Sequence, residues 1–88
     1  MAKLFKVDGT IENVEPENGK SFTLEELQKM VGGLIQVVPV FEDKFIIVDE
    51  EGRLKGYQHN VIASLLVMDE INGDIVGDML ICNRSEFK

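Results

Sequence analysis

Histidine and cysteine, the side chains behind much metal and nucleophile chemistry, occur once each in this chain, as His59 and Cys82. A single cysteine excludes an intrachain disulfide, and the apolar neighbours Leu80 and Ile81 predict a buried, unreactive thiol. One histidine and one cysteine also fall short of the four ligands of a structural zinc site. We therefore expect no metal, no cofactor and a reducing, cytoplasmic location.

Basic residues are scarce as well. Nine Lys and Arg stand against 16 Asp and Glu, which gives a formal net charge of −7. This excess of negative charge opposes direct binding to nucleic acid through a basic patch. It either keeps a small domain soluble or favours cationic partners, among them nucleic-acid-binding proteins. The composition identifies no particular protein or small-ligand partner, and it leaves a homo-oligomer open.

Long apolar runs are also missing. No stretch approaches the roughly 18 residues that span a bilayer, and the first residues lack the apolar core of a secretory signal. We expect a soluble intracellular protein without membrane contact. The 88 residues, 44% of them hydrophobic, are enough for one domain over residues 1–88 and too few for two.

The most strongly specified element is a short helix that begins after Thr23. Thr23 is a good N-cap, and Glu26 three residues later completes a capping box. Gly32 supplies the left-handed residue that commonly ends a helix. One apolar stripe is expected to face the sheet. The stripe consists of Leu24, Leu27 and Val31.

Segments of β-type composition separated by turn residues predict an antiparallel sheet. The expected strands are residues 4–7, 10–14, 34–41, 45–49, 53–57 and 75–82. Asp8 and Gly9 predict a type I′ turn in the first hairpin. Residues 34–41 are apolar on both faces and predict a central strand. The Pro39 end of that strand is expected at a sheet edge, at a bulge or beyond the paired region, with weaker pairing there. Residues 45–49 and 53–57 then complete a three-stranded meander.

The second half of the chain is less clearly patterned. Asn60 is a good N-cap for a second helix over residues 61–68, although a strand there remains an alternative. Gly77 marks a bulge or a close backbone crossing, and Phe87 is expected to pack on the core. The predicted class is α+β: a mostly antiparallel sheet of five or six strands, one capped helix on one face and a possible second short helix.

A catalytic site needs a nucleophile, a base and an orienting group, and His59 is the one candidate base of this type. It would have to act with Ser21, Ser64 or Ser85, and no G-x-S-x-G signature supports such a pairing. A loop histidine beside the Asn60 cap is the simpler interpretation. An enzyme that gathers His59, Tyr57 and a carboxylate in one pocket stays an alternative.

Acidic turns are the remaining surface feature. They are Glu42-Asp43, Asp49-Glu50-Glu51, Asp69-Glu70 and Asp74. If the fold merged them, they would present carboxylates to a basic groove, whereas dispersed acids would only improve solubility. The candidate binding residues are therefore Asp49, Glu50, Glu51, Tyr57, His59 and Asn60.

Residues 27–38, 48–54, 60 and 74–81 follow a recognisable order: helix, Gly-Gly, strand, acidic-Glu-Gly turn, lone Asn and an Ile-Val-Gly strand. In this order the chain resembles the family called domain of unknown function 3846, over about residues 24–82. The resemblance implies a compact α+β module of the kind found in bacteria, phages and mobile elements, and it implies no activity.

Together these observations lead to a functional hypothesis: a non-enzymatic accessory protein that binds a protein or a small ligand. An acidic inhibitor of a host nucleic-acid-binding protein is one alternative. A small enzyme that uses His59 is the other.

Overall fold

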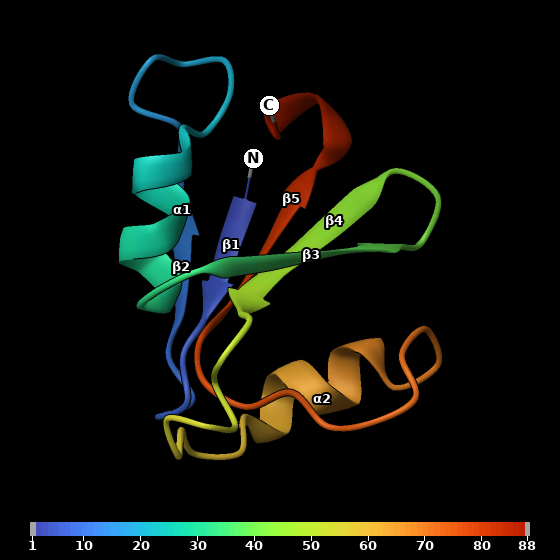
Figure 1. The fold of residues 1–88 in the computed structure, drawn as a ribbon. Coiled ribbons are helices and arrows are strands. Elements are labelled where there is room, and N and C mark those ends of the chain that lie inside the picture. Colours follow the sequence, from blue (N-terminus) through green and yellow to red (C-terminus); the bar gives the residue numbers. More distant parts are fainter. Residues whose placement is uncertain (1, 88) are drawn as a thin grey trace.

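The computed structural model describes residues 2–87 and is built on a five-stranded antiparallel sheet with one helix on each face (Figure 1). This architecture confirms the predicted α+β class. Within these residues, no helix is long and apolar enough to cross a membrane. The elements are β1 (Ala2–Phe5), β2 (Ile11–Val14), α1 (Leu24–Val31), β3 (Ile35–Val40), β4 (Lys44–Asp49), α2 (Val61–Val67), β5 (Met79–Asn83) and a 3-10 turn, η1 (Arg84–Glu86).

The two ends of the chain meet in the middle of the sheet. The strand order is β2-β1-β5-β4-β3, so β5 lies between β1 and β4. Leu80 of β5 is opposite Leu4 on one side and Ile47 on the other. The sheet is therefore closed by pairing between segments that are far apart in sequence.

The prediction of a central strand over residues 34–41 is wrong, because β3 is an edge strand that pairs with β4 alone among the described strands. Pairing also continues past Pro39, which lies opposite Phe45. The Leu34 carbonyl accepts a hydrogen bond from the Glu50 N–H at 2.7 Å, so by alternation the nitrogen of Pro39 faces the open edge. The missing donor of proline costs no ladder bond there.

Both faces of β3 are apolar, and each face contacts one of the two core clusters. Val37 packs against the core cluster below α1, and Val38 packs against the cluster below α2. Two-sided burial of an edge strand gives the same sequence pattern as a central strand.

The expected third strand of the meander does not form. Residues 53–57 make turns, with Gly56 at φ +74° and the side chain of Leu54 86% exposed. The segment has little apolar surface to bury against a sheet. β5 takes the place beside β4, because it buries Met79 and Leu80 completely.

The first hairpin is confirmed, but its type I′ turn is not. Among the described residues, Phe41 is the one non-glycine residue with positive φ, so Asp8 does not adopt the required conformation. Gly9, at φ +93°, supplies the single left-handed position, and Lys6 pairs through its N–H with the Thr10 carbonyl at 2.9 Å. The connection is a three-residue loop over residues 7–9.

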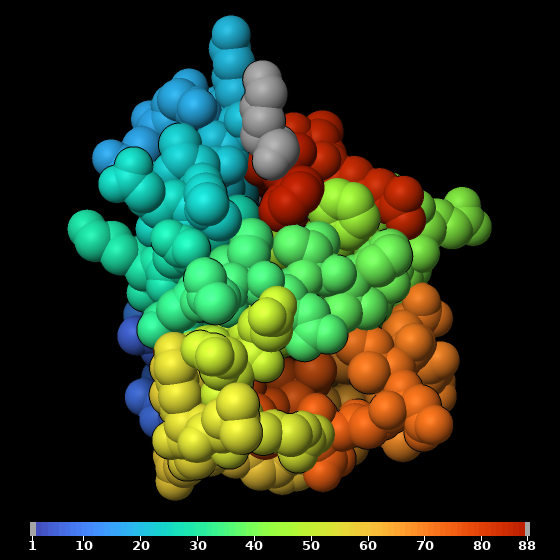
Figure 2. Space-filling model, in the orientation of Figure 1, coloured from blue at the N-terminus to red at the C-terminus, as the bar shows by residue number. Residues whose placement is uncertain are grey.

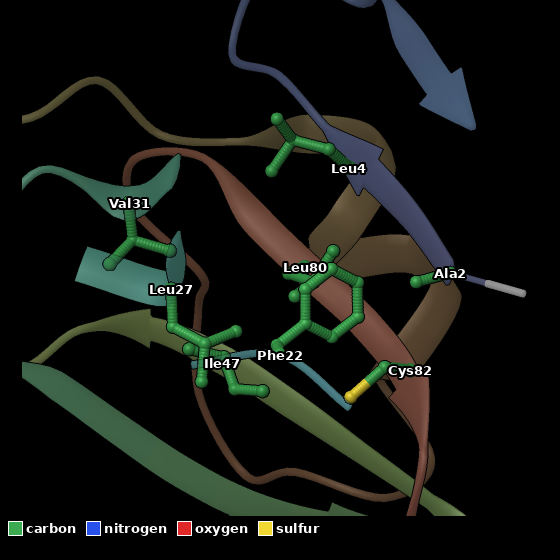
Figure 3. Close-up of a cluster of buried hydrophobic side chains, with 8 residues drawn as sticks. All are labelled: Ala2, Leu4, Phe22, Leu27, Val31, Ile47, Leu80 and Cys82. Atoms are coloured by element: carbon green, nitrogen blue, oxygen red, sulfur yellow. The ribbon is translucent and has the colours of Figure 1, made fainter. Parts of the chain in front are cut away.

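Side chains on the α1 face form the first core cluster (Figure 3). Its buried members are Ala2, Leu4, Phe22, Leu27, Val31, Ile47, Leu80 and Cys82. Leu24 was expected in this stripe, but its side chain is 57% exposed, and Met30 packs there in its place. The second cluster lies on the opposite face and contains Phe5, Val40, Ile46, Val48, Ala63, Val67, Ile75 and Met79.

The signals predicted for the two ends of α1 and for Phe87 are confirmed. Thr23 Oγ1 accepts the Glu26 N–H at 3.2 Å, and Glu26 Oε1 accepts the Thr23 N–H at 2.8 Å. Gly32 ends α1 at φ +101°. The Phe87 ring packs edge-on against Phe45, with ring centroids 5.2 Å apart.

The capping box predicts a specific stability pattern. Thr23→Ala should lower the free energy of unfolding by about 1 kcal/mol, because the Glu26 N–H loses its acceptor, whereas Thr23→Ser should cost only a few tenths. Urea denaturation of the three proteins measures the difference. Equal stability of the Ala and Ser variants would contradict the capping role.

Candidate functional site

The last residue of β4, Asp49, and the connection that leads from β4 to α2 carry all six predicted site residues (Figure 1). The structure does not gather them in one place. Asp49 and Tyr57 belong to an anchor that holds the connection down, His59 lies in a polar cluster, and Asn60 caps α2. Glu50 and Glu51 lie on the turn between these groups.

Asp49 is the centre of the anchor. Its side chain is 1% exposed, and its Oδ2 accepts a hydrogen bond from Lys55 Nζ at 2.8 Å. Its Oδ1 accepts the Glu51 N–H, also at 2.8 Å. Lys55 Nζ additionally reaches the Gly32 carbonyl at the end of α1, at 3.3 Å. The carboxylate therefore ties a turn to a helix and is not displayed at the surface.

The anchor shifts the pKa of each of its groups. Burial disfavours ionised Asp49, but hydrogen bonds from Lys55, the Glu51 N–H and Tyr57 outweigh burial and hold the pKa of Asp49 below its usual range. The hydrogen bond with Asp49 raises the pKa of Lys55. The same carboxylate, together with burial, raises the pKa of Tyr57. At neutral pH the three groups are carboxylate, ammonium and phenol.

Tyr57 is enclosed by glycines, and this contact explains why glycine stands at those positions. A Cβ at Gly32 would lie 2.6 Å from the Tyr57 hydroxyl, and one at Gly77 would lie 2.6 Å from its ring. A Cβ at Gly33 would meet Lys55 Nζ. Gly77 was predicted to mark a bulge or a close backbone crossing, but the group that lies against it is the side-chain ring of Tyr57. A side chain at any of these three glycine positions would therefore collide with Tyr57 or Lys55.

His59 lies beside Ser64 and Asp74, a set of residues that invites a catalytic interpretation. Its Nε2 is 3.2 Å from Ser64 Oγ and 3.7 Å from Asp74 Oδ1. A hydrolase triad places the serine and the carboxylate on opposite ring nitrogens, whereas here both face the same one. Ser64 Oγ also accepts the Ile75 N–H at 2.9 Å and donates to the Ile75 carbonyl at 3.3 Å. The serine is thus occupied in fastening a loop to α2.

Tyr57 and His59 also do not share the cavity that Tyr57 lines. That cavity, of about 430 Å³, lies between the end of α1 and the crossing before β5, and its lining does not include His59. Within residues 2–87, no three His, Cys, Asp or Glu side chains are placed to hold a metal ion.

Asn60 is completely buried and uses its whole amide group. Its Oδ1 accepts the Ala63 N–H at 3.1 Å, which confirms both the N-cap and the helical alternative for the segment that follows. Its Nδ2 donates to the Phe5 carbonyl and to the Gly77 carbonyl, each at 2.9 Å. One side chain therefore joins α2, β1 and the crossing before β5.

The acidic turns fall into two groups at opposite ends of β4, about 17 Å apart by the rise of a strand. Glu42 and Asp43 lie at one end, where Glu70 Oε1 accepts the Phe41 N–H at 2.7 Å. Glu50 and Glu51 lie at the other end. The fold does not merge them into a single patch.

A groove that the sequence did not indicate lies on the α2 side of β3 and β4. Figure 2 shows it as a hollow between the turn after β4, in yellow, and the loop before β5, in orange. Its volume is about 360 Å³, within the range of small-ligand sites. The apolar lining is Val38, Ile46, Val48, Leu54, Ile71, Ile75 and Val76, and the rim carries Gln36, Glu50, Arg53, Asn72 and Asp74.

A larger hollow, of about 840 Å³, runs along α1. It is lined almost entirely by polar and charged side chains, with Leu34 as its one large apolar residue. Apolar surface supplies most of the affinity of small-ligand sites, so the smaller groove is the better candidate. No local sequence motif indicates this groove, because its lining comes from three separate stretches of the chain, residues 36–38, 46–54 and 71–76.

Comparison with known proteins gives one match. A family model described as Domain of unknown function (DUF3846) matches residues 4–87, nearly the whole chain, and confirms the resemblance noted in the sequence. No curated protein and no solved structure matches.

The anchor predicts a pH-dependent contribution to stability. The folded pKa of Asp49 lies below its unfolded value, so its contribution is present above about pH 4 and is lost as pH falls through the folded pKa. Asp49→Asn should lower the free energy of unfolding by about 1 to 3 kcal/mol at pH 7 and by less at pH 3. Urea denaturation at both values tests this, with exposed Asp43→Asn as the control. A cost that is equal at both pH values would contradict the linkage.

The buried hydrogen bonds of Asn60 predict that the same isosteric substitution, Asn to Asp, has very different effects on stability at two positions. Asn60→Asp keeps the cap but loses both amide donors and sets a carboxylate against two carbonyl oxygens, so it should cost about 2 to 4 kcal/mol at pH 7. Asn72→Asp, in an exposed loop, makes the same chemical change and should be nearly neutral. Thermal denaturation compares them. Similar stability of the two variants would rule out the buried bonding of Asn60.

Proposed function

The chain belongs to the DUF3846 family, a domain of unknown function, and from this premise we propose that it is a non-enzymatic accessory protein. Its task is to bind a partner protein or small ligand in the groove between the turn after β4 and the loop before β5. The cytoplasmic location, which rests on the composition, and the phage or mobile-element setting, which rests on the family resemblance, are part of the same proposal.

The observation that carries the proposal is an apolar floor held open between two fastened walls. The first wall is fixed by the Asp49–Lys55 pair. The second is fixed where Ile75 bonds to Ser64 and where its carbonyl accepts the Asn60 N–H at 2.8 Å. Arg53, in the first wall, donates a hydrogen bond from its Nη2 to the Asp74 carbonyl in the second wall, at 3.0 Å. A cavity with fixed walls binds without a large ordering cost.

The rim favours an aliphatic group that ends in a positive charge. Glu50 and Asp74 place two carboxylates at the rim, and Arg53 is its one cation and already bonds to a carbonyl. The chain as a whole carries a net charge of −7. The side chain of a lysine fits this chemistry, because its stem would cover the floor while its ammonium stays at the acidic rim. We infer a lysine of a partner protein as the occupant.

The site geometry supports the proposal that the protein is not an enzyme. Ser64 and Asp74 face the same nitrogen of His59, and Tyr57 is bound to Asp49 in a separate cluster. Neither arrangement leaves a free nucleophile beside a base.

A second candidate is an acidic inhibitor of a nucleic-acid-binding protein. Glu42, Asp43, Asp69 and Glu70 support it, because the bond between Phe41 and Glu70 brings the two acidic turns together at one end of β4. Such binding would depend strongly on salt and would not require the groove.

Titration with n-butylammonium, a mimic of the lysine side chain, tests the groove. We expect saturable shifts of backbone NMR signals at Val48, Leu54 and Ile75, and weaker shifts with butyrate. Glu50→Lys should raise the dissociation constant about two- to five-fold, because an exposed charge contributes up to about 1 kcal/mol.

The matched control is Glu15→Lys, which makes the same charge change at an exposed site outside the groove. It should leave the affinity unchanged. Equal effects of both variants, or shifts spread over the molecule, would refute the groove as the site.

A further inference from the structure

β3 leaves part of the sheet unpaired at its outer edge. Bonds to the neighbouring strand alternate along an antiparallel strand, and the bond from the Glu50 N–H to the Leu34 carbonyl fixes which residues of β3 use them. Ile35 and Val37 therefore direct their N–H and carbonyl groups away from β4. Among the described residues, none accepts a hydrogen bond from these two N–H groups. In Figure 2 the strand, in green, lies uncovered along one side of the groove.

The other end of the same edge is closed. Pro39 has no N–H to offer, and Glu70 Oε1 accepts the N–H of Phe41 at 2.7 Å. Proteins block edge strands in such ways because an open edge pairs with other chains. In β3 the block covers one end only. The open end is the one that begins beside Glu50, on the rim of the groove.

The geometry of β3 joins this open edge to the groove. Gln36 and Val38 alternate with the two open residues and line the groove on the α2 side. A strand added to the edge would lie about 4.8 Å away, and its residues opposite Gln36 and Val38 would present their side chains on the groove side. Its residues opposite Ile35 and Val37 would form the backbone hydrogen bonds.

We infer that an extended segment of the partner protein pairs antiparallel with β3 and directs a lysine into the groove. Strand addition of this kind gains affinity from main-chain hydrogen bonds and selectivity from sites for alternate side chains. The five strands of the sheet are antiparallel to their neighbours, so an antiparallel segment continues the same bonding pattern. The choice of lysine rests on the proposed function, in which Glu50 and Asp74 form the acidic rim.

Charge argues against a second copy of this chain as the added strand. Each copy carries a net charge of −7, and the groove beside the open edge already has two carboxylates on its rim. Like charges brought together at an interface repel one another. A segment that carries lysine relieves this charge instead.

The opposite edge of the sheet provides a control. The bond from the Lys6 N–H to the Thr10 carbonyl shows, by the same alternation, that Ile11 and Asn13 of β2 face outward. β2 contributes no residue to the groove. An added strand there would have no site for a lysine side chain.

A capped heptapeptide in which threonine and valine alternate around a central lysine, acetyl-TVTKTVT-amide, tests the pairing. We expect saturable shifts of the backbone NMR signals of Ile35 and Val37. N-methylation of the two threonines that flank the lysine removes the donors that face β3, so it should raise the dissociation constant about ten-fold or more. N-methylation of the lysine, whose N–H faces away from β3, should change it less than about two-fold.

Val37→Pro tests the edge from the side of the protein. Proline costs no ladder bond at this position, as at Pro39, but it removes one donor to the heptapeptide. The dissociation constant of the heptapeptide should rise about three- to ten-fold. That of n-butylammonium, which does not need the edge, should stay within about two-fold and shows that the variant is folded. Asn13→Pro makes the same change at the control edge and should leave both constants unchanged.

The pairing and the groove fail in different ways. If n-butylammonium binds but neither Val37→Pro nor methylation of the threonines weakens the heptapeptide, strand addition is overturned and the groove stands. If methylation weakens the heptapeptide but n-butylammonium does not bind and norleucine replaces the lysine without loss, the lysine site is overturned and the pairing stands. A wild-type chain that dimerises through β3 in sedimentation equilibrium would overturn the inference, because the edge would already be occupied.

Discussion

The ion pair between the buried Asp49 carboxylate and the solvent-accessible Lys55 ammonium is the interaction on which the rest of the molecule depends. It lies where β4 ends and where an irregular connection of residues 50–60 must be held against the sheet and α1. Without it the turn would have few apolar contacts of its own, since Leu54 faces solvent. Tyr57 fills the space beside the pair, and the glycines around it leave room for its ring. A polar anchor thus replaces a third strand.

A second polar group, the Asn60 amide, performs the corresponding task on the other face. It joins α2 to β1 and to the crossing before β5. Buried polar groups with all their bonds satisfied specify one arrangement, because any shift leaves a donor or acceptor unpaired. Within the described residues no buried side-chain nitrogen or oxygen lacks a partner. The Asp49–Lys55 pair and the Asn60 amide therefore fix the relative positions of elements that the apolar clusters hold together without directional bonds.

The sequence predicted the features that depend on neighbouring residues. The Thr23 capping box, the end of α1 at Gly32 and the Asn60 cap follow from local bonding rules and were confirmed. The sequence did not predict that β5 would take the place beside β4, because strand order depends on long-range pairing. It treated Asp49 as a surface acid, since nothing local shows that Lys55 and Tyr57 fold over it. The groove was missed for the same reason, because β3, β4 and two loops each supply only part of its lining.

The groove has a polar rim and fixed walls, which suit a partner that comes and goes. Asn60 and Ser64 bond to the crossing and to Ile75, so α2 also fixes one wall of the groove. The position of α2 and the shape of the groove are therefore linked through these hydrogen bonds.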